Sequence, residues 1–237
     1  WQNFNLDNSN NHDQNNKGGF YFSILVSLGH KKTLKADPMP YIVSWFNIEA
    51  GGVLDVEPGS VLKILNGSSL SIKGTLKAQG APDKPITFTT FFDDSDGYDS
   101  DNSEVAPQEG AWKNIQFIGA SSSDSILDYV VVKYGGSGMD TCPYAYLGGP
   151  CMAYEGALLI DGASPVVSRS TFDRNLAIAL YVKDSARPTI SDSVISNTKT
   201  AIATPSSSIG GYGISIGAES SPVLTGNVYG GNIENVI

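Results

Sequence analysis

The stretch ALLIDGASPVVSRSTFDRN (residues 157–175) decides the fold, because two later stretches repeat its plan. They are ALYVKDSARPTISDSVISN (residues 179–197) and GISIGAESSPVLTGNVYGGN (residues 213–232). Each of the three contains a short apolar segment, a Gly/Ser-rich turn, a proline and two further short segments, and each ends on Asn. Self-similarity of this kind indicates a repeat architecture, in which one supersecondary unit recurs along the chain.

The prolines give the period of this repeat. Pro165 and Pro188 lie 23 residues apart, and Pro222 follows after 34 residues, which is 23 plus an insertion of 11. The insertion corresponds to the turn-rich sequence TPSSSIGGYG at residues 204–213. A unit of about 23 residues is long enough for three short strands and the turns that join them, but the period alone does not separate strands from helices.

The alternation of residue types within the repeat favours strands. In residues 167–172 (VSRSTF) and 190–195 (ISDSVI), apolar and polar residues follow a spacing of two, whereas helices need spacings of three and four. A single coil of three short strands cannot bury its apolar side. Stacking each coil on its neighbour at about 4.8 Å supplies both backbone hydrogen bonds and a continuous core. We therefore predict an all-β fold, a right-handed parallel β-helix with loop insertions.

The same pattern extends upstream, less regularly. It is carried by IEAGGVLDVEPGSVLKI (residues 48–64), GTLKAQGAPDKPITFTT (74–90), GAWKNIQFIG (110–119) and ILDYVVVKYGG (126–136). This succession resembles the right-handed β-helix domains of large bacterial surface and secreted proteins, which share the pectate-lyase-like superfold. The resemblance implies the fold and an extracellular or cell-surface location. It says little about activity, because this superfold hosts lyases, hydrolases, adhesins and passive stalks.

The domain organisation follows from where the repeat is visible. We expect residues 1–40 to form an N-terminal leader or cap and residues 41–237 to form the β-helix. A cap is needed because the open end of a solenoid exposes unpaired strand edges and core. The sequence stops at NIENVI, which reads as the middle of a coil, so we expect further domains of the same protein to adjoin it.

Composition excludes two classes of partner. The formal net charge is −9 and only three residues are arginine, so nucleic acid, which requires clustered basic residues, is not an expected partner. No segment is long and apolar enough to predict a membrane span; the apolar run at residues 20–28 has about half the required length.

An acidic insertion at residues 93–104 (DDSDGYDSDNSE) gives the strongest signal for a binding site. Carboxylates at near-alternate positions around a glycine turn can direct several oxygen atoms onto a hard cation such as Ca²⁺. The spacing resembles short extracellular calcium loops but does not satisfy the EF-hand pattern. The alternative is a solvated acidic loop without a metal. The predicted calcium ligands are Asp94, Asp96, Asp99 and Asp101.

Two cysteines, Cys142 and Cys151, lie in the single turn-rich segment TCPYAYLGGPC. Their proximity in one predicted loop favours a local disulfide over free thiols, which would fit an oxidising compartment. A metal site is a poorer interpretation, because two thiols without a neighbouring His do not complete a zinc site.

Aromatic residues gather in these two insertions. Aromatic ring faces beside carboxylates are typical of sugar-binding sites, since the ring covers C–H groups while the acids bind hydroxyls. The alternative is that these rings pack their own loops onto the β-helix. The candidate ligand-binding residues are Phe91, Phe92, Tyr98, Tyr134, Tyr144, Tyr146 and Tyr154.

Catalysis has weaker support in the sequence. Lyases of the superfold that this chain resembles combine calcium-bound acids with a basic residue. The residues here that could form such a site are Asp173, Arg174 and Asp192, with Arg169 and Lys183 on neighbouring coils. A glycoside hydrolase needs two carboxylates across a cleft. Asp128, Asp161 and Asp173 could approach one another, but no spacing selects a pair.

These observations predict a non-enzymatic extracellular or cell-surface module that acts as a scaffold or adhesin. Its expected partner is a polysaccharide or cell-surface glycan. The alternative function is that of a polysaccharide lyase or glycoside hydrolase.

Overall fold

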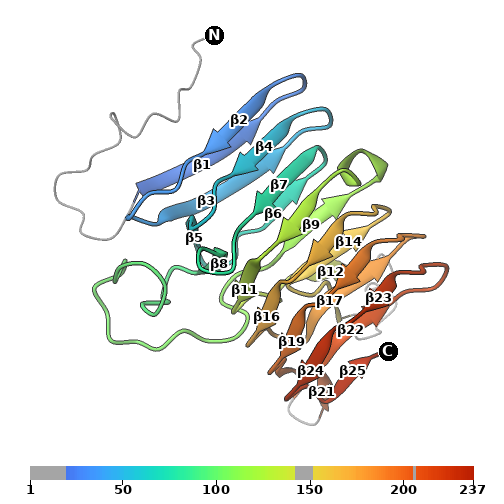
Figure 1. The fold of residues 1–237 in the computed structure, drawn as a ribbon. Helices are drawn as coiled ribbons and strands as arrows, with labels where there is room; N and C mark the ends of the chain where they lie inside the picture. Colours follow the sequence, from blue (N-terminus) through green and yellow to red (C-terminus); the bar gives the residue numbers. More distant parts are fainter. Residues whose placement is uncertain (1–19, 142–151, 205–206) are drawn as a thin grey trace.

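The chain folds as a parallel β-helix, as the sequence predicted. A computed structural model describes residues 20–141, 152–204 and 207–237. Short strands stack coil upon coil from β1 and β2 at one end to β22–β25 at the other (Figure 1). Each complete coil contributes one strand to each of three faces, and strands within a face pair in parallel with the equivalent strands of the neighbouring coils.

The first face consists of the strands that open each coil. In stacking order they are β1 (Phe20–Val26), the second half of β3 (Tyr41–Ile48), β6 (Leu70–Ile72), β9 (Ile115–Ile118), β14 (Leu158–Asp161), β17 (Ile178–Lys183), β22 (Tyr212–Ile216) and β25 (Glu234–Val236).

The second face is the seven-stranded sheet. Its strands are β2 (Lys31–Leu34), β4 (Val53–Val56), β7 (Thr75–Gln79), β10 (Ile126–Asp128), β15 (Val166–Ser168), β18 (Thr189–Ser191) and β23 (Val223–Thr225).

The third face closes each coil. It begins with the first half of β3 and continues with β5 (Val61–Ile64), β8 (Ile86–Thr90), β11 (Val130–Lys133), β16 (Thr171–Asp173), β19 (Val194–Ser196) and β24 (Val228–Gly230). It joins the first face through β3, whose residues 41–43 pair with β5 while residues 46–48 pair with β6.

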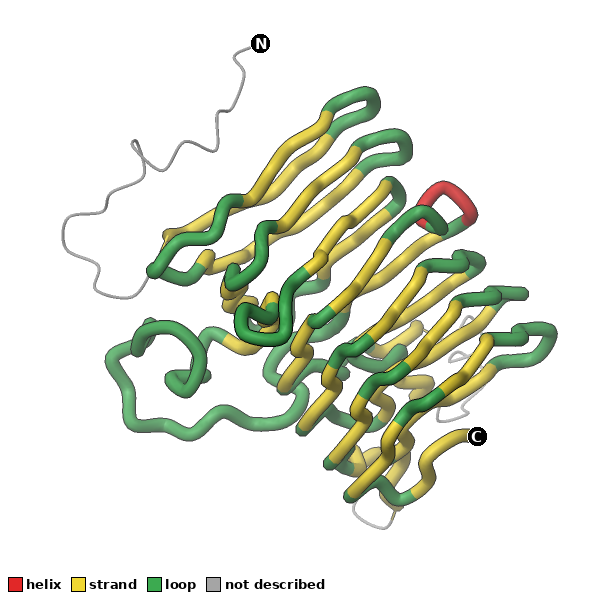
Figure 2. Tube along the Cα trace, viewed as in Figure 1, coloured by secondary structure: helices red, strands yellow, loops and turns green. Residues whose placement is uncertain are grey.

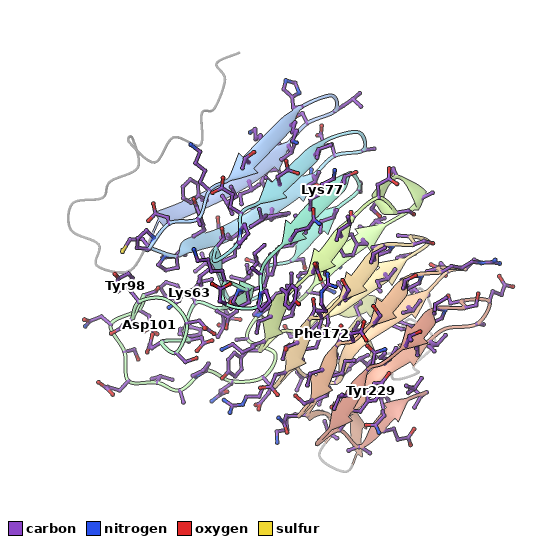
Figure 3. The ribbon with its side chains drawn as sticks, in the orientation of Figure 1. Lys63, Lys77, Tyr98, Asp101, Phe172 and Tyr229 are labelled. Atoms are coloured by element: carbon purple, nitrogen blue, oxygen red, sulfur yellow. The ribbon has the colours of Figure 1, made fainter. Side chains whose placement is uncertain are left out.

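The core is a set of columns of apolar side chains that run along the stack. Leu127, Val167 and Ile190 lie in register on three successive strands of the second face and are fully buried. Phe172, labelled in Figure 3, lies in a corresponding column of the third face. This register is the physical outcome of the spacing of two in the sequence, because residues two apart point to the same side of a strand. The predicted core is confirmed.

Polar side chains at the inner corners join successive coils. The buried amide of Asn175 accepts a hydrogen bond from Gly135 N at 2.9 Å and donates one to the carbonyl of Val132 at 3.1 Å. Asn232 makes the same two bonds to Thr198 N and the carbonyl of Ile195. These bonds satisfy backbone groups at corners where the ladder of strand hydrogen bonds is interrupted, as buried polar groups require.

Left-handed residues make the sharp corners. Arg174, which precedes Asn175, has a φ of 50°, and the equivalent position of the last coil is Gly231 with a φ of 68°. One residue in this region turns the chain abruptly, at a cost of about 1–2 kcal/mol for a non-glycine residue. The final Asn of each sequence repeat therefore marks a corner.

The coil stack begins earlier than the predicted boundary at residue 41. β1 pairs in parallel with the whole of β3, and β2 pairs with β4. Residues 20–40 are therefore coil and not only a cap, and the apolar side chains of Ile24, Val26 and Leu34 belong to the main core. The irregular turn KADPMP at residues 35–40 hides this first coil from a search for the repeat. The expected leader at residues 1–19 lies outside the described residues.

Three insertions leave the stack at one corner, where the third face meets the first. Residues 91–114 separate β8 from β9; residues 134–157 separate β11 from β14 and contain the antiparallel pair β12 (Met139–Thr141) and β13 (Met152–Tyr154). The third insertion contains the antiparallel strands β20 (Thr200–Thr204) and β21 (Ser207–Gly210). Figure 2 shows the first of them as a long loop that projects from the stack.

Helical structure is minor in the described part of the chain. A short 3₁₀ helix, η2 (Ala120–Ser122), lies between β9 and β10. Within residues 20–141, 152–204 and 207–237, no helix has the length and apolar character needed to cross a bilayer.

Candidate functional site: the acidic insertion and the adjoining groove

The acidic insertion is anchored to the third face by a buried ion pair. Lys133 of β11 lies 2.8 Å from Asp93, whose side chain is only 1% exposed, and also pairs with Asp96. The hydroxyl of Thr89 donates a further hydrogen bond to Asp93 at 2.6 Å. Burial alone would raise the pKa of Asp93, but the hydrogen bonds from Lys133, Ser95 and Thr89 outweigh it and hold that pKa below its usual value.

A second lysine holds the insertion from the other side. Lys63 of β5 is completely buried, and its ammonium group donates a hydrogen bond to the carbonyl oxygen of Tyr98. Figure 3 places Lys63 beside Tyr98 and Asp101 of the insertion. Burial lowers the pKa of Lys63, and the carboxylates of Asp94, Asp93, Asp101 and Asp99 oppose that effect. Lys63 is thus a positive charge under an acidic loop.

The strand between these lysines shows what the insertion covers. β8 lies between β5 and β11, and all five of its residues are buried, including the outward-facing Thr87 and Thr89. An outer strand face in contact with water would leave alternate residues exposed. The insertion therefore packs over the third face at β5, β8 and β11 as an ordered layer.

Three of the four predicted calcium ligands come together. Carboxylate oxygens of Asp94, Asp99 and Asp101 all lie within 4.8 Å of one another. Desolvation and the neighbouring charge of Asp99 raise the pKa of Asp94 above its usual value. Hard oxygen donors at this separation suit Ca²⁺, although exposed acidic groups can also meet without a cation.

The fourth predicted ligand, Asp96, is not part of that cluster. Its carboxylate pairs with Lys133 and so serves to anchor the loop. Backbone amides take up part of the remaining acidic charge: Asn102 N donates to Asp99 at 2.6 Å and Ser103 N donates to Asp101 at 3.1 Å. The candidate cation site is therefore formed by three carboxylates and not four.

A groove lies where the returning arm of the insertion passes the turn after β5. It encloses about 360 Å³, and polar and apolar groups share its walls. Its lining consists of Asn66, Phe92, Val105, Ala106, Gln108, Glu109, Gly110 and Ala111. A volume in the range of about 300–1,000 Å³ with a few convergent polar groups is typical of small-molecule sites.

The aromatic residues divide into two groups. Tyr98 is exposed (51%), and Phe91 and Phe92 are half-buried with their rings edge to face at 5.7 Å. Tyr134 and Tyr154 are buried, so neither presents a ring face to a ligand, and for these two the packing alternative holds. Tyr154 belongs to a satellite apolar cluster with Ala177, Ile178 and Ala201.

Four predicted residues belong to the part of the second insertion outside the described residues. Tyr144 and Tyr146 lie outside the described residues. So do Cys142 and Cys151, and the predicted disulfide stays a prediction.

The candidate catalytic acids of the coils are paired between neighbouring coils. Asp128 accepts two hydrogen bonds from the guanidinium of Arg169, at 2.9 and 2.6 Å. Asp173 accepts hydrogen bonds from Ser196 and Asn197 of the next coil, at 2.7 and 2.8 Å. Both carboxylates lie on the outer surface, where their hydrogen bonds connect one coil to the next.

One pair of acids meets closely. Burial and a hydrogen bond shared with the carboxyl group of Asp184 raise the pKa of Asp161, while Lys183 lies 3.3 Å from Asp161. Glycosidases separate their two carboxyl groups by at least about 5 Å so that the substrate fits between them. The carboxylates of Asp161 and Asp184 instead converge on one ammonium group, that of Lys183, at 3.3 and 3.9 Å.

Sequence reasoning missed the lysines that hold the insertion and, apart from Phe92, the residues that line the groove. Lys63 and Lys133 occupy outward positions of their strands, where a lysine normally contacts water, so nothing in the local pattern marks them. Asn66 lies in the turn after β5, whereas Gln108 and Glu109 are neighbours in the arm at residues 105–111, and only the fold brings the two segments together.

Comparison of the chain with protein-family models, with curated proteins and with solved structures found no match in any of the three. The assignment to the parallel β-helix class therefore rests on strand pairing and register alone.

Proposed function

We propose that this chain is a non-enzymatic module of an extracellular or cell-surface protein, a β-helical scaffold or adhesin that binds a glycan through the insertions at one corner. We also propose that its fold belongs to the pectate-lyase-like superfold that the sequence resembles. The supporting observation is the common exit of all three insertions where the third face meets the first. Loops gathered on a rigid scaffold commonly carry recognition.

The charge arrangement supports binding in preference to catalysis. Three of the acids considered for catalysis, Asp128, Asp173 and Asp161, are engaged by Arg169, Asn197 and Lys183 respectively. Among the residues that the structure describes, one carboxylate, that of Glu109, lines the groove beside the insertion. A hydrolase of the usual kind needs a second carboxyl group across the bound sugar.

Incubation of the chain with a panel of soluble polysaccharides tests the proposal. We expect retention of the chain on at least one immobilised polysaccharide, without release of reducing or unsaturated sugars over several hours. Release of such products at a rate typical of enzymes, about 1 per second or faster, would contradict the non-enzymatic assignment. Failure to bind any member of the panel would contradict glycan binding.

Calcium binding by Asp94, Asp99 and Asp101 remains a proposal with its own test. Extracellular calcium modules bind with dissociation constants of about 10⁻⁴–10⁻³ M. At tenfold excess over such a value, calcium would stabilise the fold by about 1.4 kcal/mol, which corresponds to a rise of about 3–6 °C in the melting temperature for a chain of this size. Thermal unfolding with calcium and with chelator measures this shift.

Matched variants decide whether that shift comes from the cluster. Asp99→Asn should abolish the calcium-dependent rise, whereas Asp83→Asn, at an exposed position in another turn, should leave it intact. An equal melting temperature with calcium and with chelator in the unmodified chain would rule out a calcium site here. The acidic loop would then rely on Lys63 and backbone amides for its charge balance.

A further inference from the structure

The groove between the turn after β5 and the arm at residues 105–111 combines the features that a sugar ring requires. The half-buried ring of Phe92 supplies an apolar wall. Around it lie a carboxylate at Glu109 and two amides at Asn66 and Gln108. A sugar offers C–H groups on one side and hydroxyls at its edges, so it needs one aromatic wall and a few polar groups with both donors and acceptors.

The charge around the groove selects among sugars. The insertion that forms one wall also carries Asp94, Asp99 and Asp101, and the chain as a whole has a net charge of −9. The hydrogen bond to Tyr134 is the main cause that raises the pKa of the Arg174 guanidinium, Asp173 adds to it, and Glu109 contributes least, so Arg174 is engaged mainly by partners other than Glu109. A uronic acid would bring a further carboxylate into this acidic region, where like charges repel and where none of the described residues that line the groove is a lysine or arginine.

We infer that this groove binds one unit of a neutral polysaccharide, with Phe92 against the sugar ring and Glu109 accepting hydrogen bonds from its hydroxyls. The volume of about 360 Å³ is at the lower end for ligand sites, which suits a single sugar unit. The inference rests on the proposed function and adds the location of the site and the charge class of its ligand.

The test is a titration of dextran, a galactomannan and polygalacturonate into the chain and three variants. We expect the unmodified chain to bind a neutral polymer at least tenfold more tightly than polygalacturonate at low salt. Phe92→Ala should weaken that binding by about tenfold, because it removes the aromatic wall. Glu109→Gln should weaken it by about fivefold, because a neutral acceptor replaces a charged one.

Trp45→Ala provides the control, because Trp45 is an exposed aromatic of β3 that does not line the groove and lies outside the insertions. It should bind as the unmodified chain does. Glu109→Gln conserves shape, so it keeps the test valid if Phe92→Ala fails to fold, which its melting temperature would reveal.

The outcomes separate the two proposals. If the unmodified chain binds a neutral polymer but neither Phe92→Ala nor Glu109→Gln is weakened, the groove is not the site, while glycan binding stands. Tighter binding of polygalacturonate than of the neutral polymers would contradict the inference that the groove prefers an uncharged sugar. Binding of none of the polymers would contradict glycan binding itself.

Discussion

Lys133→Met is expected to destabilise the fold by about 3 kcal/mol, because it leaves the buried carboxylate of Asp93 without its cation. Removing one partner of a buried ion pair typically costs about 3–5 kcal/mol, since the remaining charge has lost its hydration and its partner. The lower end applies here because Asp93 keeps hydrogen bonds from Thr89 and Ser95, and because the lysine side chain is 14% exposed. Urea unfolding of both chains measures the difference.

Lys31→Met is the matched control for this prediction. Lys31 forms an ion pair of 2.6 Å with Asp55, but its side chain is 65% exposed. Exposed pairs contribute about 0–1 kcal/mol, so this variant should unfold within that margin of the unmodified chain. Equal losses in the two variants would show that burial does not set the strength of the Lys133–Asp93 pair.

The same pair gives a pH dependence with a definite sign. The pKa of Asp93 is lowered in the fold, so its contribution to stability is present above the unfolded value of about 3.9 and is lost as the pH falls through the folded value. The pKa of Lys133 is raised, so its contribution is lost only as the pH rises above about 10.4 and passes through the folded value.

The difference between the unmodified chain and Lys133→Met should therefore be largest near neutral pH and shrink below about pH 4. Urea unfolding at a series of pH values checks this. A difference that grows on acidification would mean that another group dominates.

The second large effect is expected for Asn175→Ala, at about 3 kcal/mol. The substitution removes the hydrogen bonds to Gly135 N and to the carbonyl of Val132, both in the buried interior of a corner. A buried backbone group left without a partner costs about 1–3 kcal/mol, and two are created here. Chemical denaturation measures the total, and faster amide exchange at Gly135 would locate it.

Asn232→Ala tests whether burial sets this cost. Asn232 makes the same pair of hydrogen bonds, at 3.0 and 2.8 Å, but it lies in the last coil and is only half-buried. Thr198 and Ile195, which carry the two backbone groups, are buried, but removal of the half-buried Asn232 side chain opens a path for water to them, so we expect a loss of about 1 kcal/mol. A loss as large as that of Asn175→Ala would contradict the explanation.

Much of the fold was predictable because a solenoid is built from local repeats. The alternation within β15 and within β16 assigns inward and outward positions, with a shift by one residue at the corner Arg169, and the period of 23 residues stacks Val167 on Ile190 without reference to distant parts of the chain. The pattern failed at residues 20–40, where a longer turn before residue 41 breaks the period although the strands pair normally.

The candidate site was predictable only in part. Asp94, Asp99 and Asp101 are close in sequence, so a tight loop brings their carboxylates together whatever the rest of the chain does. Asp96 lies outside the carboxylate cluster, and Asp93 anchors the insertion, because both pair with Lys133. Lys133 is about 40 residues away in the sequence and reaches them only through the register of β8 and β11.

The sequence alone determines the coil, its column of core side chains and its corners, because each of these depends on residues that are two apart or one period apart. What the folded chain alone decides is which outward side chains become buried and which turns share a groove. Lys63 has the sequence environment of a surface lysine, and it is buried because an insertion about 35 residues later folds back over its strand. An outward side chain is buried only through a contact with a distant part of the chain. The local alternation of apolar and polar residues does not indicate such a contact.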